Sequence, residues 1–230
     1  MRITRLHLLS RDLESQHQFY AGTLGFPVLA RSATTLTIAI GDSQLNLIDA
    51  RAAGSAAHVP AHFAFNIPYD QLLAAKAWLA PRMPLLADQS GRSDFHNEAF
   101  ASHQIYFLDP DGNIGELIGR ARLPASVGEP FTAATAVRGL SEIGLAVPDV
   151  PAVVRGYCAA LGPSRYGPEP GAEFAAVGDD DGMLIVVRAG RIWFPETGIP
   201  ADPLWLEAEL RANGRTFRLV GPPYRVLPIP

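Results

Sequence analysis

The chain has 230 residues, of which 48% are hydrophobic and 18% are charged, and its formal net charge is −4 at pH 7. These values suit one large or two small globular domains and give no reason to expect nucleic acid or an anionic membrane as a partner. No apolar run approaches the ~20 residues that a membrane-spanning helix needs. Cys158 is the only cysteine, which excludes an internal disulfide and favours a reducing compartment. Because residues 1–10 also lack the apolar core of a signal peptide, we expect a cytoplasmic protein.

The N-terminal residues predict a β-α-β-β-β unit. Residues 3–10 alternate like a strand, with Arg5 and His7 on the face opposite Leu6. Asp12 predicts the N-cap of a helix and Gly25 its end. Strand-like runs then follow at residues 26–31, 35–40 and 44–49.

The same pattern restarts after a turn-rich linker at residues 52–60. In the first strand of this unit, His62 shares a face with Ala64 and Asn66. The other predicted parts are a helix at 70–79, a polar irregular stretch at 88–100 and a strand pair at 104–119.

The strand pair at 104–119 is built around the segment Asp109-Pro110-Asp111-Gly112-Asn113, which has turn chemistry throughout. In the strand that follows, Glu116 shares a face with Ile114 and Ile118. A carboxylate between two isoleucines is costly unless a cation, a network of donors or a proton neutralises it. The alternative is a glutamate that reaches solvent or an arginine across an edge strand.

A third unit begins near Leu140. Asp149 and Gly162 lie thirteen residues apart, as Asp12 and Gly25 do, and such matched spacing indicates duplicated modules. Beyond Gly190 there is no helix pattern, and Asn213-Gly214 predicts a two-residue hairpin turn. We therefore expect a two-module domain at 1–120, a linker at 121–137, and a third module with a C-terminal β-hairpin at 138–230.

These motifs together resemble the vicinal oxygen chelate superfamily, which includes glyoxalase I, extradiol dioxygenases and bleomycin-resistance proteins. The resemblance covers residues 1–120 and 138–190. It rests on Asp12-Leu13-Glu14 with Phe19-Tyr20 and Leu24-Gly25-Phe26, on His62-Phe63-Ala64-Phe65, and on the Asp109–Asn113 turn with Glu116-Leu117. It implies an α+β fold in which tandem βαβββ modules form a curled mixed sheet around a cup, with helices outside. It does not define a reaction, because the superfamily includes lyases, dioxygenases, epimerases and metal-free binding proteins.

In members that bind a metal, the ligands come from the first and last strands of each module. Here the resemblance places Arg5 and His62 at the first-strand positions, and Asn46 and Glu116 at the last-strand positions. An arginine cannot ligate a metal, and an amide is a poor ligand for a transition metal. His7 completes a metal-binding set with His62 and Glu116 only if the strand shifts, because two residues along a strand span ~6.6 Å.

Two uses of the N-terminal cup stay open. In the favoured one, Arg5 pairs with Glu116 in place of a metal, and the cup binds a small organic molecule. In the alternative, the protein is a metal-dependent lyase or extradiol-type dioxygenase, with Glu116 as a catalytic residue. The ion would then be one divalent Fe, Mn, Ni or Zn, and its candidate ligands are His7, His62 and Glu116. The candidate ligand-binding residues are Arg5, Asn46, Asn66, His96 and Glu142.

The third module has an incomplete set of ligand positions. Glu142 occupies the first-strand position, while the last-strand position falls at Leu184, which cannot ligate anything. We expect Glu142 to bind Arg191 or a backbone amide. Because a lone half-cup exposes apolar surface, the third module should pack on the first domain or on a second chain, and we favour a homodimer.

Overall fold

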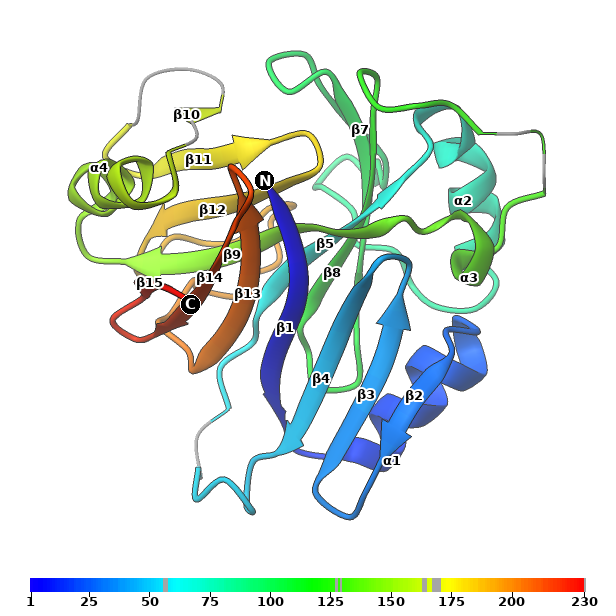
Figure 1. Ribbon diagram of the computed structural model, residues 1–230. Coiled ribbons are helices and arrows are strands. Elements are labelled where there is room, and N and C mark those ends of the chain that lie inside the picture. The colour runs from blue at the N-terminus through cyan, green and yellow to red at the C-terminus, as the bar shows by residue number, and fades with distance from the viewer. Residues whose placement is uncertain (56–57, 127, 129, 163–164, 167–170, 230) are drawn as a thin grey trace.

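The computed structural model describes residues 1–55, 58–126, 128, 130–162, 165–166 and 171–229, and it shows a mixed α+β protein made mostly of strands (Figure 1). All strands belong to one sheet, whose main path runs in the order β15-β14-β13-β1-β9-β5-β8-β7-β6. Two residues of the predicted 121–137 linker, Val127 and Glu129, lie outside the described residues. No helix within the described part of the chain is long and apolar enough to cross a membrane.

Three segments repeat the βαβββ order. The first contains β1 (Arg2–Ser10), α1 (Leu13–His17), the π-helical turn η1 (Gln18–Thr23), β2 (Val28–Arg31), β3 (Thr35–Ile40) and β4 (Ser43–Asp49). The second contains β5 (His62–Ile67), the 3-10 turn η2 (Tyr69–Gln71), α2 (Leu72–Leu79), β6 (Phe95–Asn97), β7 (Ser102–Leu108) and β8 (Ile114–Arg120). The third contains β9 (Gly139–Val147), α4 (Val150–Leu161), β10 (Arg165–Tyr166), β11 (Phe174–Asp179) and β12 (Gly182–Arg188). The helix α3 (Ala133–Ala136) precedes the third segment, and β13 (Leu206–Ala212), β14 (Arg215–Gly221) and β15 (Arg225–Pro228) end the chain.

The predicted helix caps and the predicted hairpin are confirmed. Asp12 and Asp149 are N-caps whose carboxylates accept hydrogen bonds from backbone N–H groups of the first helical turn. Gly162 ends α4 with a φ of 73°. Asn213 and Gly214 have φ values of 49° and 71° and connect β13 to β14. The strand β15, which the sequence did not indicate, continues this hairpin by pairing with β14.

Two extended antiparallel strand pairs join the modules, and a single pairing of Ile3 on β1 with Leu140 on β9 connects them. In one, β5 pairs with β9 and Phe63 lies opposite Ile143; in the other, β1 pairs with β13 and Arg5 lies opposite Glu209. The second module therefore adjoins the third, whereas the first module adjoins the C-terminal strands. We call these units the β5/β9 half (β5–β12) and the β1/β13 half (β1–β4 with β13–β15).

This pairing differs from the expected cup of first and second modules. The physical reason is that β13 supplies an antiparallel partner for β1, so β5 takes β9 as its neighbour instead. The division of the chain at residues 120 and 138 stays a prediction.

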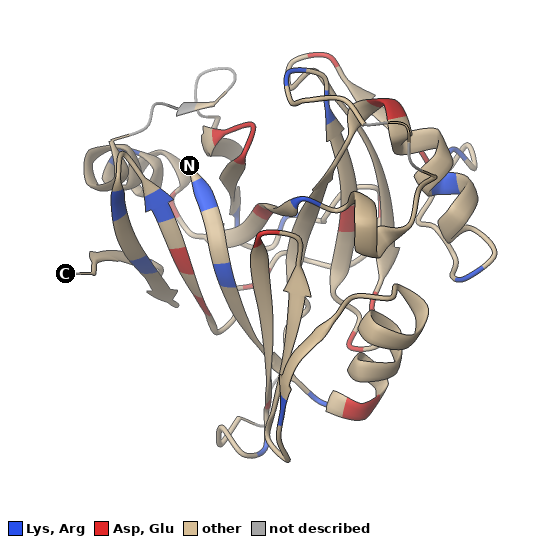
Figure 2. Ribbon diagram, turned by 45° about the vertical axis from the view of Figure 1, so that its right-hand side comes forward, with Lys and Arg blue, Asp and Glu red and all other residues tan. Residues whose placement is uncertain are grey.

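Acidic and basic residues lie side by side on β1, β13 and β14 (Figure 2).

The two halves share one apolar core. Strands of both halves contribute residues to this core, and three of these residues, Leu45, Phe65 and Leu206, are fully buried. Helix α1 contacts β3 and β4, α2 contacts β7 and β8, and α4 contacts β11, β12 and β15. Because burial of one such side chain contributes roughly 1.5–3 kcal/mol, this shared core stabilises both halves together.

The turn between β7 and β8 links the second module to the helix of the first. The buried Asp109 carboxylate accepts hydrogen bonds from Tyr20 Oη and Gln16 Nε2, both at 3.1 Å, and from the backbone N–H groups of Asp111 and Asn113 at 2.9 Å. Burial raises the pKa of Asp109, and the donors from Asn113 and Gln16 oppose this effect. The turn motif in the sequence thus serves the contact between modules.

Candidate metal centre

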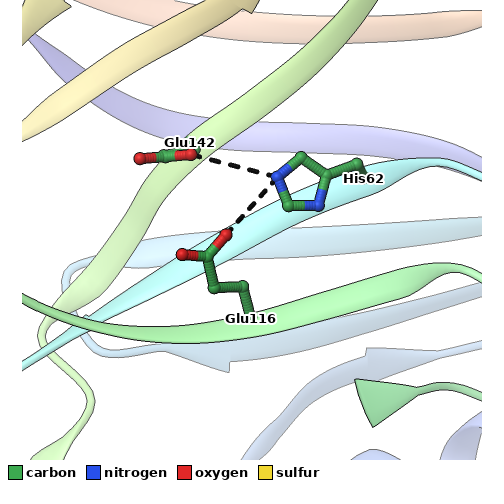
Figure 3. Close-up of side chains that lie close together, drawn as sticks. All are labelled: His62, Glu116 and Glu142. Carbon is green, nitrogen blue, oxygen red and sulfur yellow. Dashed lines mark ion pairs between the residues drawn. The ribbon is translucent and has the colours of Figure 1, made fainter. Parts of the chain in front are cut away.

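Three buried side chains converge where β5, β8 and β9 run side by side (Figure 3). Nε2 of His62 lies 3.5 Å from Oε2 of Glu116 and 3.9 Å from Oε2 of Glu142. One ligand atom from each residue can be chosen so that all lie within 4.8 Å of one another. None of the three residues is more than 6% exposed.

Strand register brings these side chains together. Ala64 on β5 pairs with Glu116 on β8 and with Glu142 on β9. Since successive side chains alternate between faces, both carboxylates project on the face that carries His62 and Ala64. The small Ala64 side chain leaves room between them.

The three residues line a cavity of about 710 Å³. Its described lining residues lie between His62 and Ile118 and between Glu142 and Phe194, so the cavity belongs to the β5/β9 half. His62, Glu116 and Glu142 form its buried floor, while the exposed His96 and Phe194 stand at its rim. Glu116 thus lies on a cavity-facing strand surface as expected, but the cup is formed by the second and third modules.

Arg120 fixes the orientation of Glu142. The arginine is fully buried, and its Nη2 donates to Oε1 of Glu142 and, at 3.4 Å, to Oγ of Ser141. Such charge-assisted bonds are stronger than neutral ones. With Oε1 occupied, Oε2 of Glu142 faces His62. The expected partner of Glu142, Arg191, also lines the cavity, but the ion pair forms with Arg120.

The surroundings of the two carboxylates separate their pKa values. Burial, followed by repulsion from Glu142, raises the pKa of Glu116 well above its ordinary value. Burial alone would raise the pKa of Glu142 as well, but His62 and Arg120 outweigh it and lower that pKa. Glu116 therefore takes up a proton more readily than Glu142, as in sites where one carboxyl acts as acid or base.

The residues fit a divalent metal ion. The distances of 3.5 and 3.9 Å from His62 Nε2 to the two carboxylates exceed the ~2.7–2.9 Å of a charge-assisted hydrogen bond. Nε2 is therefore the His62 nitrogen that would ligate the ion, since it is the one that faces both carboxylates. One imidazole and two carboxylates suit Zn, Fe, Mn or Ni, and three protein ligands leave positions open for a substrate.

The register also identifies the fourth position of this site. Gly144 pairs with Ile185 on β12, just as Ala64 pairs with Glu116 on β8. The last-strand position is therefore Ile185, which lines the cavity, and not Leu184, which lies in the shared core. An isoleucine supplies no ligand atom, so this wall of the site is apolar.

Arg5, His7 and Asn46 lie in the β1/β13 half. Arg5 donates to Gln44 Oε1 and Glu209 Oε1, both at 3.0 Å, so the pair expected between Arg5 and Glu116 does not form. His7 likewise lies outside the cluster of His62, Glu116 and Glu142. The reason lies in the tertiary structure, because β1 lies beside β13 whereas the cluster is built on β5, β8 and β9.

The β1/β13 half nevertheless repeats the register of the centre. His7 pairs with Asn46 on β4 and Glu207 on β13, as Ala64 pairs with Glu116 and Glu142. By this count Arg5 corresponds to His62, Asn46 to Glu116 and Glu207 to Glu142. The sequence pattern predicts Arg5 and Asn46 at these positions but not Glu207, because the last unit has no helix pattern to reveal its register.

Asn66 and His96 do not reach the cluster. Asn66 Nδ2 donates to the backbone oxygen of Asp180 at 3.1 Å, and the residue lines a different cavity. His96 stacks on His103, with the ring centroids 3.6 Å apart, at the rim of the metal-site cavity. Their ligand-binding roles stay predictions.

Two residues beside the centre were not singled out from the sequence. Arg120 continues the alternation of Glu116 and Ile118 on β8, so the strand period could have placed it on the same face. Trp193 contacts His62, with ring centroids 5.1 Å apart, but it lies after β12 in a segment with no periodic pattern. No local signal could have found it.

A buried His–Glu–Glu cluster at the junction of two βαβββ modules makes this α+β protein a candidate metal-binding protein. The chain belongs to the Glyoxalase/Bleomycin resistance protein/Dioxygenase superfamily, whose model matches residues 2–117. Members of this superfamily often bind a divalent metal, and they bind small molecules as substrates. A comparison with curated proteins found no match.

The fold is similar to that of a solved bacterial protein. A "putative dioxygenase" from Bacillus subtilis subsp. subtilis str. 168 aligns with a TM-score of 0.59 and 15% identity over 81% of this chain. The aligned part spans 63% of that protein, less than two thirds of its length. A lactoylglutathione lyase from Agrobacterium tumefaciens aligns over 51% of this chain and 92% of its own, with 21% identity and a TM-score of 0.44.

Proposed function

We propose that the protein is an enzyme that uses one divalent metal ion, held by His62, Glu116 and Glu142, to act on a small organic molecule. The observation that supports this most is the convergence of three buried ligand atoms within 4.8 Å on the floor of a large cavity. A divalent ion bound there supplies a Lewis acid for two neighbouring oxygen atoms of the substrate. Both lyase and dioxygenase chemistry fall within this proposal.

The protein's own residues have separate tasks in this proposal. Arg120 holds the Glu142 carboxylate in place and balances its charge. Glu116 is the candidate acid–base residue, because burial and the neighbouring Glu142 raise its pKa above the ordinary value of a glutamate. With a doubly charged ion, two carboxylates and one arginine, the centre carries one net positive charge, which favours an anionic oxygen of the substrate.

A second candidate function is metal-free binding in the same cavity. It is favoured by the buried Arg120–Glu142 ion pair, in which an arginine balances the charge of one carboxylate without a metal ion. The sequence favours this function because Arg5 occupies a ligand position. In the structure Arg5 binds Glu209 in the other half, so it gives no support to metal-free binding in this cavity.

Metal analysis separates the two functions. Protein purified without chelator or added metal should contain about one Fe, Mn, Ni or Zn per chain by plasma mass spectrometry. His62→Ala and Glu142→Gln should each remove it, whereas the control His7→Ala should retain it. A wild-type protein that holds no metal even after incubation with each ion would favour the metal-free binding cup.

The cytoplasmic location and the homodimer also belong to this proposal. The single cysteine suits a reducing compartment. On the edge strand β2, Val28 and Leu29 are 38% and 52% exposed, which offers an apolar edge for pairing two chains. Sedimentation velocity tests this, and a monomer at all concentrations would contradict it.

A further inference from the structure

Trp193 reaches the candidate centre from a segment outside the repeated modules. Residues 190–201 follow β12 and form a compact hairpin. The Trp193 N–H donates to the backbone oxygen of Ile199 at 3.0 Å, and the Ala201 N–H donates to that of Arg191 at 2.7 Å. The Thr197 hydroxyl also donates to the Trp193 carbonyl at 3.0 Å. These bonds hold the backbone at Trp193, and the residue lines the cavity.

The indole packs directly on the histidine of the centre. Trp193 is 6% exposed, and its ring lies 5.1 Å from that of His62 at an interplanar angle of 39°. Gly144 makes this contact possible. A β-carbon at that position would lie 2.6 Å from Cη2 of Trp193 and 3.1 Å from Cβ of His62. The absence of a side chain on β9 therefore creates the space that the indole fills.

The indole nitrogen has no protein partner. Nε1 of Trp193 is buried and makes no hydrogen bond to any described residue. A buried tryptophan N–H usually finds an acceptor, and leaving one unpaired costs free energy. Nε1 is itself shielded, but Trp193 lines the cavity, so a small turn of the indole brings Nε1 within reach of an acceptor atom of a bound ligand.

The rings around Trp193 describe the shape of that ligand. Phe194 contacts Phe95 and Tyr106, with ring centroids 4.7 and 5.5 Å apart. All three residues line the same cavity as Trp193. Aromatic side chains that stand together in this way favour a flat, conjugated ligand.

We propose that Trp193 is a specificity-determining residue, which donates its Nε1–H to an oxygen atom of a flat, conjugated ligand bound over His62. This inference rests on the proposed function in that it places the ligand in the same cavity. It adds that an oxygen acceptor beside the indole, and not shape alone, selects the ligand.

Trp193→Phe tests this, because it keeps an aromatic ring and removes the donor. Equilibrium dialysis with 2-naphthol and naphthalene compares two ligands of similar shape that differ by one oxygen. The wild type should prefer 2-naphthol, and Trp193→Phe should reduce that preference about tenfold, with naphthalene affinity changed less than ~2-fold. Trp205→Phe, at a half-exposed tryptophan outside this cavity, should change neither affinity.

Equal weakening of both probes would overturn the proposal and assign Trp193 a packing role only. An unchanged preference, or a wild type that binds neither probe, would overturn it as well. Metal content is measured on the same samples. A preference that depends on Trp193 in metal-free protein would contradict the metal-dependent function and leave this inference standing.

Discussion

The β5/β9 half and the β1/β13 half share a strand register but use it for opposite purposes. In the first, the equivalent positions carry His62, Glu116 and Glu142, all buried on the floor of a cavity. In the second they carry Arg5, Asn46 and Glu207. There the Arg5 side chain is 45% exposed, and Glu207 pairs with an arginine on β14. The same geometry therefore yields a candidate centre in one half and a solvated polar face in the other.

The difference comes from what covers each face. Aromatic residues of β6 and of the 190–201 hairpin stand over the centre, and the low-dielectric surroundings strengthen every charge interaction there. In the β1/β13 half, the Arg5–Glu209 and Arg218–Glu207 pairs remain partly exposed to solvent. Strand register determines where the side chains lie, and burial determines how strongly their charges interact.

The largest expected effect comes from removing the arginine of the buried half. Arg120→Met leaves Glu142 buried without its cation, which should lower the free energy of unfolding by about 3–5 kcal/mol in urea titrations. Arg5→Met is the matched change in the other half. Because the Arg5–Glu209 pair is partly exposed, it should cost no more than about 1 kcal/mol. Similar losses in both variants would contradict the contrast between the halves.

A smaller loss is expected at the contact between modules. Asp109→Ala removes the shared acceptor of Tyr20 Oη and of the backbone N–H groups of Asp111 and Asn113, and it should cost roughly 2–3 kcal/mol because these buried donors lose their partner. Tyr20→Phe removes only one donor and should cost about 1 kcal/mol. Equilibrium unfolding measures both. Equal effects would show that Asp109 matters only through Tyr20.

Added metal should stabilise the protein through one half only. Mn²⁺ at a hundred times its dissociation constant should raise the free energy of unfolding by about 2.7 kcal/mol, because it binds the folded state. Glu142→Gln should abolish this gain in a thermal-shift assay. Glu207→Gln, at the corresponding position of the other half, should leave it intact, and its loss there would place the ion elsewhere.

The smallest effect concerns pH. Burial lowers the pKa of His103, helped by His96 and Lys76 and opposed by the hydrogen bond to Asp94. The unfolded chain therefore takes up the proton first. Neutral His103 therefore contributes its whole stabilising free energy above pH 6.5, the ordinary pKa of histidine. This contribution decreases as the pH falls from 6.5 toward the lower pKa that His103 has in the folded protein.

His103→Gln should flatten the decrease in stability between pH 7 and the acid range, as followed by unfolding at several pH values. His7→Gln should act in the same direction, because burial also lowers the pKa of His7 in the other half. A steeper decrease in either variant would contradict the direction of these shifts.

Local sequence patterns were enough for the modules and for the placement of Glu116. The caps at Asp12 and Asp149 depend on neighbouring backbone N–H groups, and the face of Glu116 depends on the two-residue period of a strand. The family resemblance rested on the same local motifs, and the match to the family model confirms it. Such features need only short stretches of chain, so they can be recognised in the sequence.

The composition of the centre was decided by tertiary structure. Glu142 joined His62 because β9 pairs with β5, and His7 was excluded because β13 pairs with β1. Arg120 and Trp193 acquired their roles from contacts across modules and not from spacing along the chain. Which strands pair depends on contacts between residues that are far apart in the sequence. The two-residue period of one strand does not specify its partner strand.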